Sequence, residues 1–68
     1  MIFKVGDIVK CLCLDGWRLA EVIEGTIATG SLITVTVKYY EADYEGDFIV
    51  TWNIKFVERL TPLEIALL

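Results

Sequence analysis

The order of turns and strands between residues 4 and 22 constrains the fold more than any other feature of this chain. Gly6-Asp7 forms an opening turn, and Asp15-Gly16 is a dipeptide typical of a tight β-hairpin. The segment between these turns, Ile8–Leu14, places Val9, Cys11 and Cys13 at alternate positions, as in a strand with one buried face. Two short strands joined so tightly predict a small, strongly bent antiparallel β-barrel.

A long second strand is expected from Trp17 to about Ala28. Ala20 and Val22 share one face of this strand and should contribute to the core. Gly25 interrupts the pattern, and a glycine within a strand is typical of a bulge or a sharp bend. The sequence therefore predicts that the second strand turns a corner near Gly25.

Three further strands complete the expected sheet. Residues 32–40 are rich in β-branched side chains and put Val35, Val37 and Tyr39 on one face, which leaves Tyr40 exposed. Residues 47–52 form a fourth strand after an acidic loop. A short helical turn at 53–56 and a last strand at 57–60 follow.

The end of the chain changes character. Thr61-Pro62-Leu63-Glu64 is a capping box with proline at the first helical position, so a short helix is expected. Because this helix is apolar nearly all round, it should be buried. We therefore expect a barrel over residues 1–61 and, over residues 62–68, a helix packed on the barrel or on a partner.

The composition suggests a single small domain with apolar surface to hide. The chain has 68 residues and is 56% hydrophobic, which is high for a domain near the lower size limit of a self-sufficient core. An oligomer or a partner would cover such surface. Neither a signal peptide nor a bilayer-spanning segment is recognised, so a soluble, intracellular protein without membrane contact is expected.

The negative charge is concentrated in one loop. The net charge is −4, and the excess lies in Glu41, Asp43, Glu45 and Asp47. A nucleic-acid partner is disfavoured because phosphate binding requires a basic surface. A cationic partner is favoured instead.

Metal binding and catalysis have little support. Cys11 and Cys13 lie two apart on one strand face, where they fit buried thiols better than a disulfide. The chain has no histidine and no second cysteine pair to complete a zinc site. The acidic loop resembles a calcium loop only loosely, since its twelfth position is Trp52. No metal, no cofactor and no catalytic residue are therefore expected.

Several short segments together resemble a Tudor domain, with the same opening also found in chromo-barrel domains. They are Phe3-Lys4-Val5-Gly6-Asp7, Asp15-Gly16, Ala20-Glu21-Val22, Val35-Thr36-Val37-Lys38-Tyr39 and Leu60-Thr61-Pro62. The resemblance implies a five-stranded SH3-like barrel, all-β apart from the short C-terminal helix. It also implies an aromatic cage that reads methylated lysine or arginine. The segment at 56–60 is also similar to one in small plasmid-type dihydrofolate reductases, but Ile49-Val50-Thr51-Trp52 stands in place of their Val-Gln-Ile-Tyr pore motif, so their activity is not expected.

Two functional hypotheses follow. In the first, a non-catalytic module binds a basic or methylated peptide through Trp17, Tyr40, Asp43, Tyr44 and Asp47. Replacing Tyr44 by alanine should then weaken binding without unfolding the domain. In the second, the chain is an assembly subunit and forms a homo-oligomer through Leu63, Ile65, Leu67 and Leu68, together with exposed Leu12 and Ile23.

Overall fold

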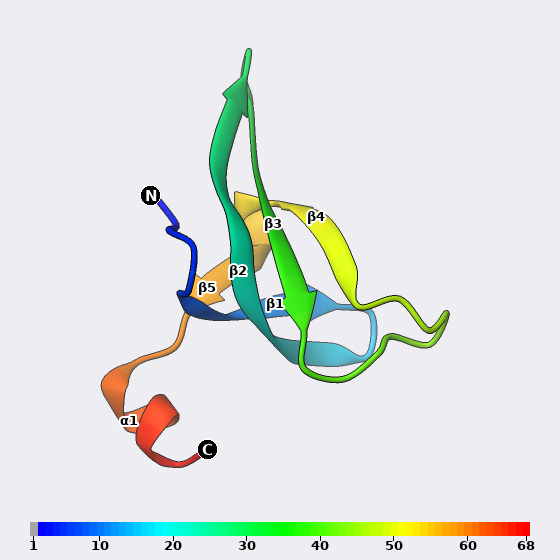
Figure 1. Ribbon diagram of the computed structural model, residues 1–68, viewed down its shortest axis with the longest axis vertical. Helices are drawn as coiled ribbons and strands as arrows, with labels where there is room; N and C mark the ends of the chain where they lie inside the picture. Colours follow the sequence, from blue (N-terminus) through cyan, green and yellow to red (C-terminus); the bar gives the residue numbers. More distant parts are fainter. Residues whose placement is uncertain (1) are drawn as a thin grey trace.

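One five-stranded antiparallel sheet and a short helix make up the computed structural model, which describes residues 2–68 (Figure 1). The elements are β1 (Ile8–Cys13), β2 (Gly16–Thr29), β3 (Leu32–Tyr39), β4 (Ile49–Asn53), the 3-10 turn η1 (Ile54–Phe56), β5 (Val57–Arg59) and α1 (Pro62–Ala66). The expected order of elements is confirmed, with boundaries that agree within two residues. Neither helical segment of the described chain is long and apolar enough to cross a bilayer.

The strands lie in the order β4-β3-β2-β1-β5, so the first strand pairs with both the second and the last. Gly16 at the β1–β2 turn has a φ of 113°, a left-handed conformation that explains why glycine follows Asp15 there. The sheet curves strongly, and η1 joins its two outer strands, β4 and β5, in the chain. The sheet itself is open.

β2 bends where the sequence predicts it. Its pairing with β3 shifts register between Val22 and Glu24 and again between Glu24 and Ile27. The N-terminal segment contacts β2 at this bend through Phe3. There the Phe3 N–H donates to Thr26 Oγ1 at 2.8 Å, and a Cβ added at Gly25 would meet the Phe3 carbonyl oxygen at 3.4 Å. The bend therefore brings the segment before β1 against β2.

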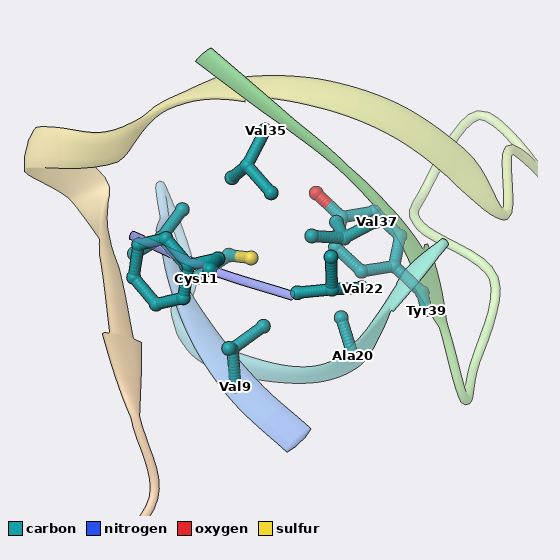
Figure 2. Packing of buried hydrophobic residues seen from close by; sticks show 9 residues of the cluster. Val9, Cys11, Ala20, Val22, Val35, Val37 and Tyr39 are labelled. Atoms are coloured by element: carbon teal, nitrogen blue, oxygen red, sulfur yellow. The ribbon is translucent and has the colours of Figure 1, made fainter. Parts of the chain in front are cut away.

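The core lies on the concave face of the curved sheet (Figure 2). Alternate residues of the three central strands, β1, β2 and β3, supply most of the core, as predicted. Phe3, from the segment before β1, and Val57, from β5, complete it. Its buried members are Phe3, Val9, Cys11, Ala20, Val22, Val35, Val37, Tyr39 and Val57. Burial of this apolar surface is the main stabilising contribution to a sheet of this size.

The C-terminal helix forms as predicted, but its expected burial is wrong within the single chain. Thr61 and Glu64 form the capping box, in which the Thr61 side chain accepts from the Glu64 N–H and the Thr61 N–H donates to the Glu64 carboxylate. A Lys10–Glu64 ion pair at 2.9 Å ties the helix to β1. No residue of α1 is buried, because one short turn of helix is too small to cover its apolar side chains.

We predict that Phe3→Ala unfolds much of the protein. Phe3 is 1% exposed, and truncating a buried phenylalanine costs about 3–5 kcal/mol. A domain of this length has a total stability of about 3–10 kcal/mol. Phe48→Ala is the matched control because Phe48 is 46% exposed. Urea unfolding followed by tryptophan fluorescence checks this, and equal midpoints for the two variants would contradict the described core.

Candidate functional site

Trp17 and Tyr40, two of the residues expected to bind a ligand, line one open pocket. This Trp17–Tyr40 pocket has a volume of about 360 Å³ and is also lined by Asp15, Arg18, Leu19 and Glu41. Trp17 is 49% exposed and Tyr40 is 53% exposed, so both aromatic rings are accessible. The pocket therefore combines two aromatic side chains with two carboxylates on a solvent-facing surface.

Strand alternation explains why these side chains meet. Trp17 and Leu19 lie on the convex face of β2, opposite to the buried Ala20, and Tyr40 follows the buried Tyr39. The Tyr40 N–H donates to the Leu19 carbonyl at 3.3 Å, which aligns the end of β3 with the start of β2. The same alternation that buries the core thus brings the exposed aromatics together.

The charge around the Trp17–Tyr40 pocket is only partly neutralised. Arg18 pairs with Asp15 at 2.8 Å, whereas Glu41 takes part in none of the ion pairs within residues 2–68. Partial burial, with a contribution from nearby Glu21, raises the pKa of the Tyr40 phenol. Tyr40 is therefore neutral at physiological pH and can present an aromatic face beside a free carboxylate.

Tyr44 and Asp43 line a different pocket, at the end of the concave face near the acidic loop. This inner pocket has a volume of about 190 Å³, and its other lining residues include Tyr39 and Trp52. The Trp52 Nε1–H donates to the Tyr39 hydroxyl at 2.9 Å, and Cys13 Sγ lies 3.7 Å from the same hydroxyl. Cys13 is only half-buried, so the expectation of two buried thiols holds for Cys11 alone.

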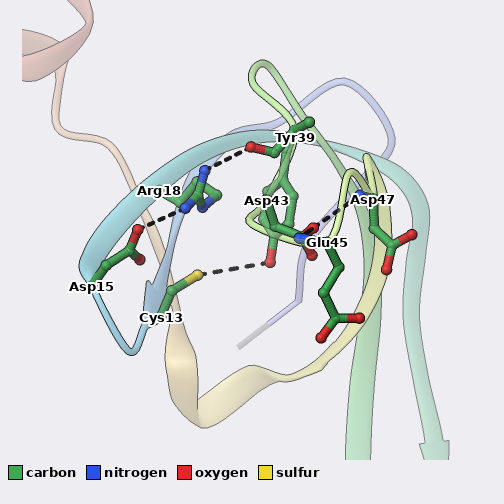
Figure 3. A network of polar contacts seen from close by, with 8 residues as sticks. Cys13, Asp15, Arg18, Tyr39, Asp43, Glu45 and Asp47 are labelled. Carbon is green, nitrogen blue, oxygen red and sulfur yellow. Dashed lines mark hydrogen bonds and ion pairs between the residues drawn. The ribbon is translucent and has the colours of Figure 1, made fainter.

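Arg18 reaches into the inner pocket (Figure 3). Its guanidinium lies 5.6 Å from the centre of the Tyr39 ring. One terminal nitrogen donates to Asp15 at 2.8 Å and the other to the Ala42 carbonyl at 3.0 Å. A cation of the chain itself thus lies against the aromatic floor of this pocket.

One carboxylate of the acidic loop stabilises the conformation of the loop itself. Asp43 Oδ1 accepts the N–H groups of Glu45 at 2.8 Å and Asp47 at 2.9 Å (Figure 3). Asp47 is exposed and lines neither pocket, while Tyr44 is 81% exposed. The five residues expected to bind together therefore divide among two pockets and the loop surface.

The tail residues form a third region beside the Trp17–Tyr40 pocket. Leu63, Leu67 and Leu68 are at least 70% exposed, and Ile65 is 47% exposed. Leu67 and Leu68, with Trp17 and Leu60, line a groove where Lys10 Nζ lies 5.1 Å from the centre of the Trp17 ring. The described residues contain no cluster of three metal-ligating side chains.

Comparison of the chain with protein-family models, curated proteins and solved structures gives no match. The function is therefore inferred from the residues that line the pockets and from their charges.

Sequence reasoning missed Arg18, although alternation contained a signal for it. Arg18 has the same parity in β2 as Ala20 and Val22, so a regular strand points it toward the concave face. From the sequence, Asp15, which pairs with Arg18, is predicted only as a turn residue. A charged residue that alternates with two core residues along one strand indicates a contact of this kind.

We predict that Tyr39 ionises late. Burial, reinforced by the contact with Cys13, raises the pKa of its phenol to about 12 from an ordinary value of 10.0. Since the unfolded chain releases this proton first, the resulting stability is complete below pH 10 and is lost as pH rises toward 12. Phenolate absorbance should show a step near pH 12 that Tyr39→Phe removes. A tyrosine titration of the folded protein that is complete near pH 10 would contradict the described burial.

Proposed function

We propose that the curved sheet is the wall of a small SH3-like, Tudor-like barrel that serves as a binding module. Three features support this proposal. The first strand pairs with both the second and the last strand, a 3-10 turn joins the last two strands, and β2 is sharply bent. A barrel of this class presents loops and strand ends at one side of a rigid sheet, which is where the two pockets lie.

The proposed activity is non-catalytic recognition of a basic peptide, in particular one with a methylated lysine or arginine. The observation that carries it is the Trp17–Tyr40 pocket, which combines two half-exposed rings with the carboxylate of Glu41, while the second carboxylate, that of Asp15, is paired with Arg18. A methylated cation is poorly hydrated and gains about 2 kcal/mol over aromatic faces in a desolvated site. The negative charge favours a cationic ligand and repels an anionic one.

The acidic loop supports the same choice of ligand. Asp43, Glu45 and Asp47 add negative charge close to the pocket, in a chain of net charge −4. Such a field accelerates the encounter with a cationic partner and weakens as salt is added. In this proposal Tyr44 and Asp47 contact peptide residues next to the cation rather than the cation itself.

We predict that Tyr40→Ala weakens binding of a trimethyl-lysine peptide about fivefold to thirtyfold, which corresponds to the loss of one cation–π contact of about 1–2 kcal/mol. Tyr44→Ala should have a smaller effect because Tyr44 lies outside this pocket. Phe48→Ala is the matched control, since it truncates a half-exposed aromatic residue that lines neither pocket.

Calorimetric titration measures the three affinities, and circular dichroism checks that each variant is folded. If the Tyr40→Ala and Phe48→Ala proteins bind as tightly as the original chain, the pocket is not the ligand site.

Assembly through the tail is the second candidate function. It is favoured by the exposure of the four apolar tail side chains Leu63, Ile65, Leu67 and Leu68. Leu67 and Leu68 also line the apolar groove together with Trp17 and Leu60. An exposed apolar group of this kind on a small protein is typical of an interaction site. The proposed occupant is the tail of a second copy of this chain.

We predict that the double variant Leu63→Ser/Leu67→Ser is monomeric at concentrations where the original chain self-associates. Leu14→Ser is the matched control, because Leu14 is 99% exposed but lies in the β1–β2 turn. Light scattering after size-exclusion chromatography measures the mass. An original chain that is monomeric at every concentration, or a double variant that retains a larger mass, would exclude assembly through the tail.

A further inference from the structure

Arg18 occupies a position that strand geometry reserves for core residues. It continues the inward-facing row of Val22 and Ala20 along β2, and its side chain is only 17% exposed. A guanidinium is costly to remove from water unless its donors find acceptors. The surroundings of Arg18 must therefore offer a favourable environment for a cation.

The inner pocket has the composition of such an environment. Tyr39 lies beneath the guanidinium, with Trp52 and Tyr44 in the same lining, so aromatic residues come from β3, β4 and the acidic loop. Asp15, which contacts the guanidinium, and Asp43 supply two carboxylates. Aromatic faces combined with carboxylates are the components of a cation-binding site.

Arg18 fills this site incompletely. Its Nε is buried and has no hydrogen-bond partner, although a guanidinium has five N–H donors to satisfy. Its carboxylate partner, Asp15, is 66% exposed, and an ion pair with so exposed a partner contributes little to stability. The ion pair with Asp15 alone therefore does not account for an arginine at this position.

We propose that the inner pocket is a second cation site and that Arg18 is its internal ligand, which keeps external guanidinium groups out. Arg18 and Asp15 also line the Trp17–Tyr40 pocket, so the two pockets adjoin at these residues. Because Arg18 fills the inner pocket, an incoming methylated side chain is confined to the Trp17–Tyr40 pocket, which we call the outer pocket. Arg18 thus determines specificity. The inner cation site does not depend on peptide binding at Tyr40, whereas the role of Arg18 in specificity rests on the proposed function.

The test is to remove Arg18 and supply a replacement cation. In Arg18→Ala, methylguanidinium at millimolar concentration should enter the inner pocket, and in Arg18→Met the longer apolar side chain should block it. The two indole N–H signals in an NMR spectrum separate the sites, because Trp52 lines the inner pocket and Trp17 the outer one. Sodium chloride at equal ionic strength controls for salt.

Arg59→Ala is the matched control. Arg59 also lies over an aromatic ring, at 5.2 Å from the centre of Phe3, and pairs with Asp7 at 3.3 Å, but it lines neither pocket. We expect a saturable shift of the Trp52 indole in Arg18→Ala at a concentration at least tenfold lower than in the original chain, Arg18→Met or Arg59→Ala.

A Trp52 response that is the same in all four proteins would overturn the proposal. If Arg18→Ala does not fold alone, methylguanidinium should restore its dispersed spectrum, and failure to do so would equally overturn it. A shift of the Trp17 indole alone would contradict the inner site while leaving the proposed function intact.

Discussion

The two faces of β2 build both the core and the Trp17–Tyr40 pocket. This strand pairs with β1 along its first half and with β3 along most of its length, and it bends between Val22 and Ile27. Its two faces therefore serve different purposes. The concave face carries Arg18, Ala20 and Val22, of which Ala20 and Val22 belong to the core. The opposite face carries Trp17 and Leu19, which line the outer pocket with Tyr40. A one-residue slip of β2 would exchange the faces and abolish both the core and the pockets.

Most of the fold was predictable because period-two burial and turn chemistry are local properties of a sequence. The alternation in β1 and β3, the Asp15-Gly16 turn and the capping box at Thr61 all gave the correct elements. Exposure of the helix was not predictable, because it depends on how much surface one helical turn covers. The site was only half predictable. Trp17 and Tyr40 line one pocket, as strand alternation predicts. The Asp43 carboxylate instead accepts hydrogen bonds from the backbone of its own loop, and the residue type alone does not distinguish this role from ligand binding.

Cations of the chain itself already cover several of its aromatic rings. Lys10 lies over Trp17, Arg18 over Tyr39 and Arg59 over Phe3, at 5.1–5.6 Å from the ring centres. These contacts engage half of the six lysines and arginines, in a chain whose ten acidic residues leave a net charge of −4. The surface near Tyr40 and Glu41 thus combines an aromatic face with unpaired negative charge. In this account, an external cation is recognised where the protein's own cations leave a ring and a carboxylate free.

Binding of a methylated cation at Tyr40 can be measured by an NMR titration of the unmodified chain with a trimethyl-lysine peptide and with its unmethylated counterpart. We expect saturable shifts of the Trp17 indole and the Tyr40 amide, with tighter binding of the methylated peptide, while the Trp52 indole behind Arg18 stays unchanged. A well-dispersed spectrum in which neither peptide moves Trp17 or Tyr40 would contradict this proposal.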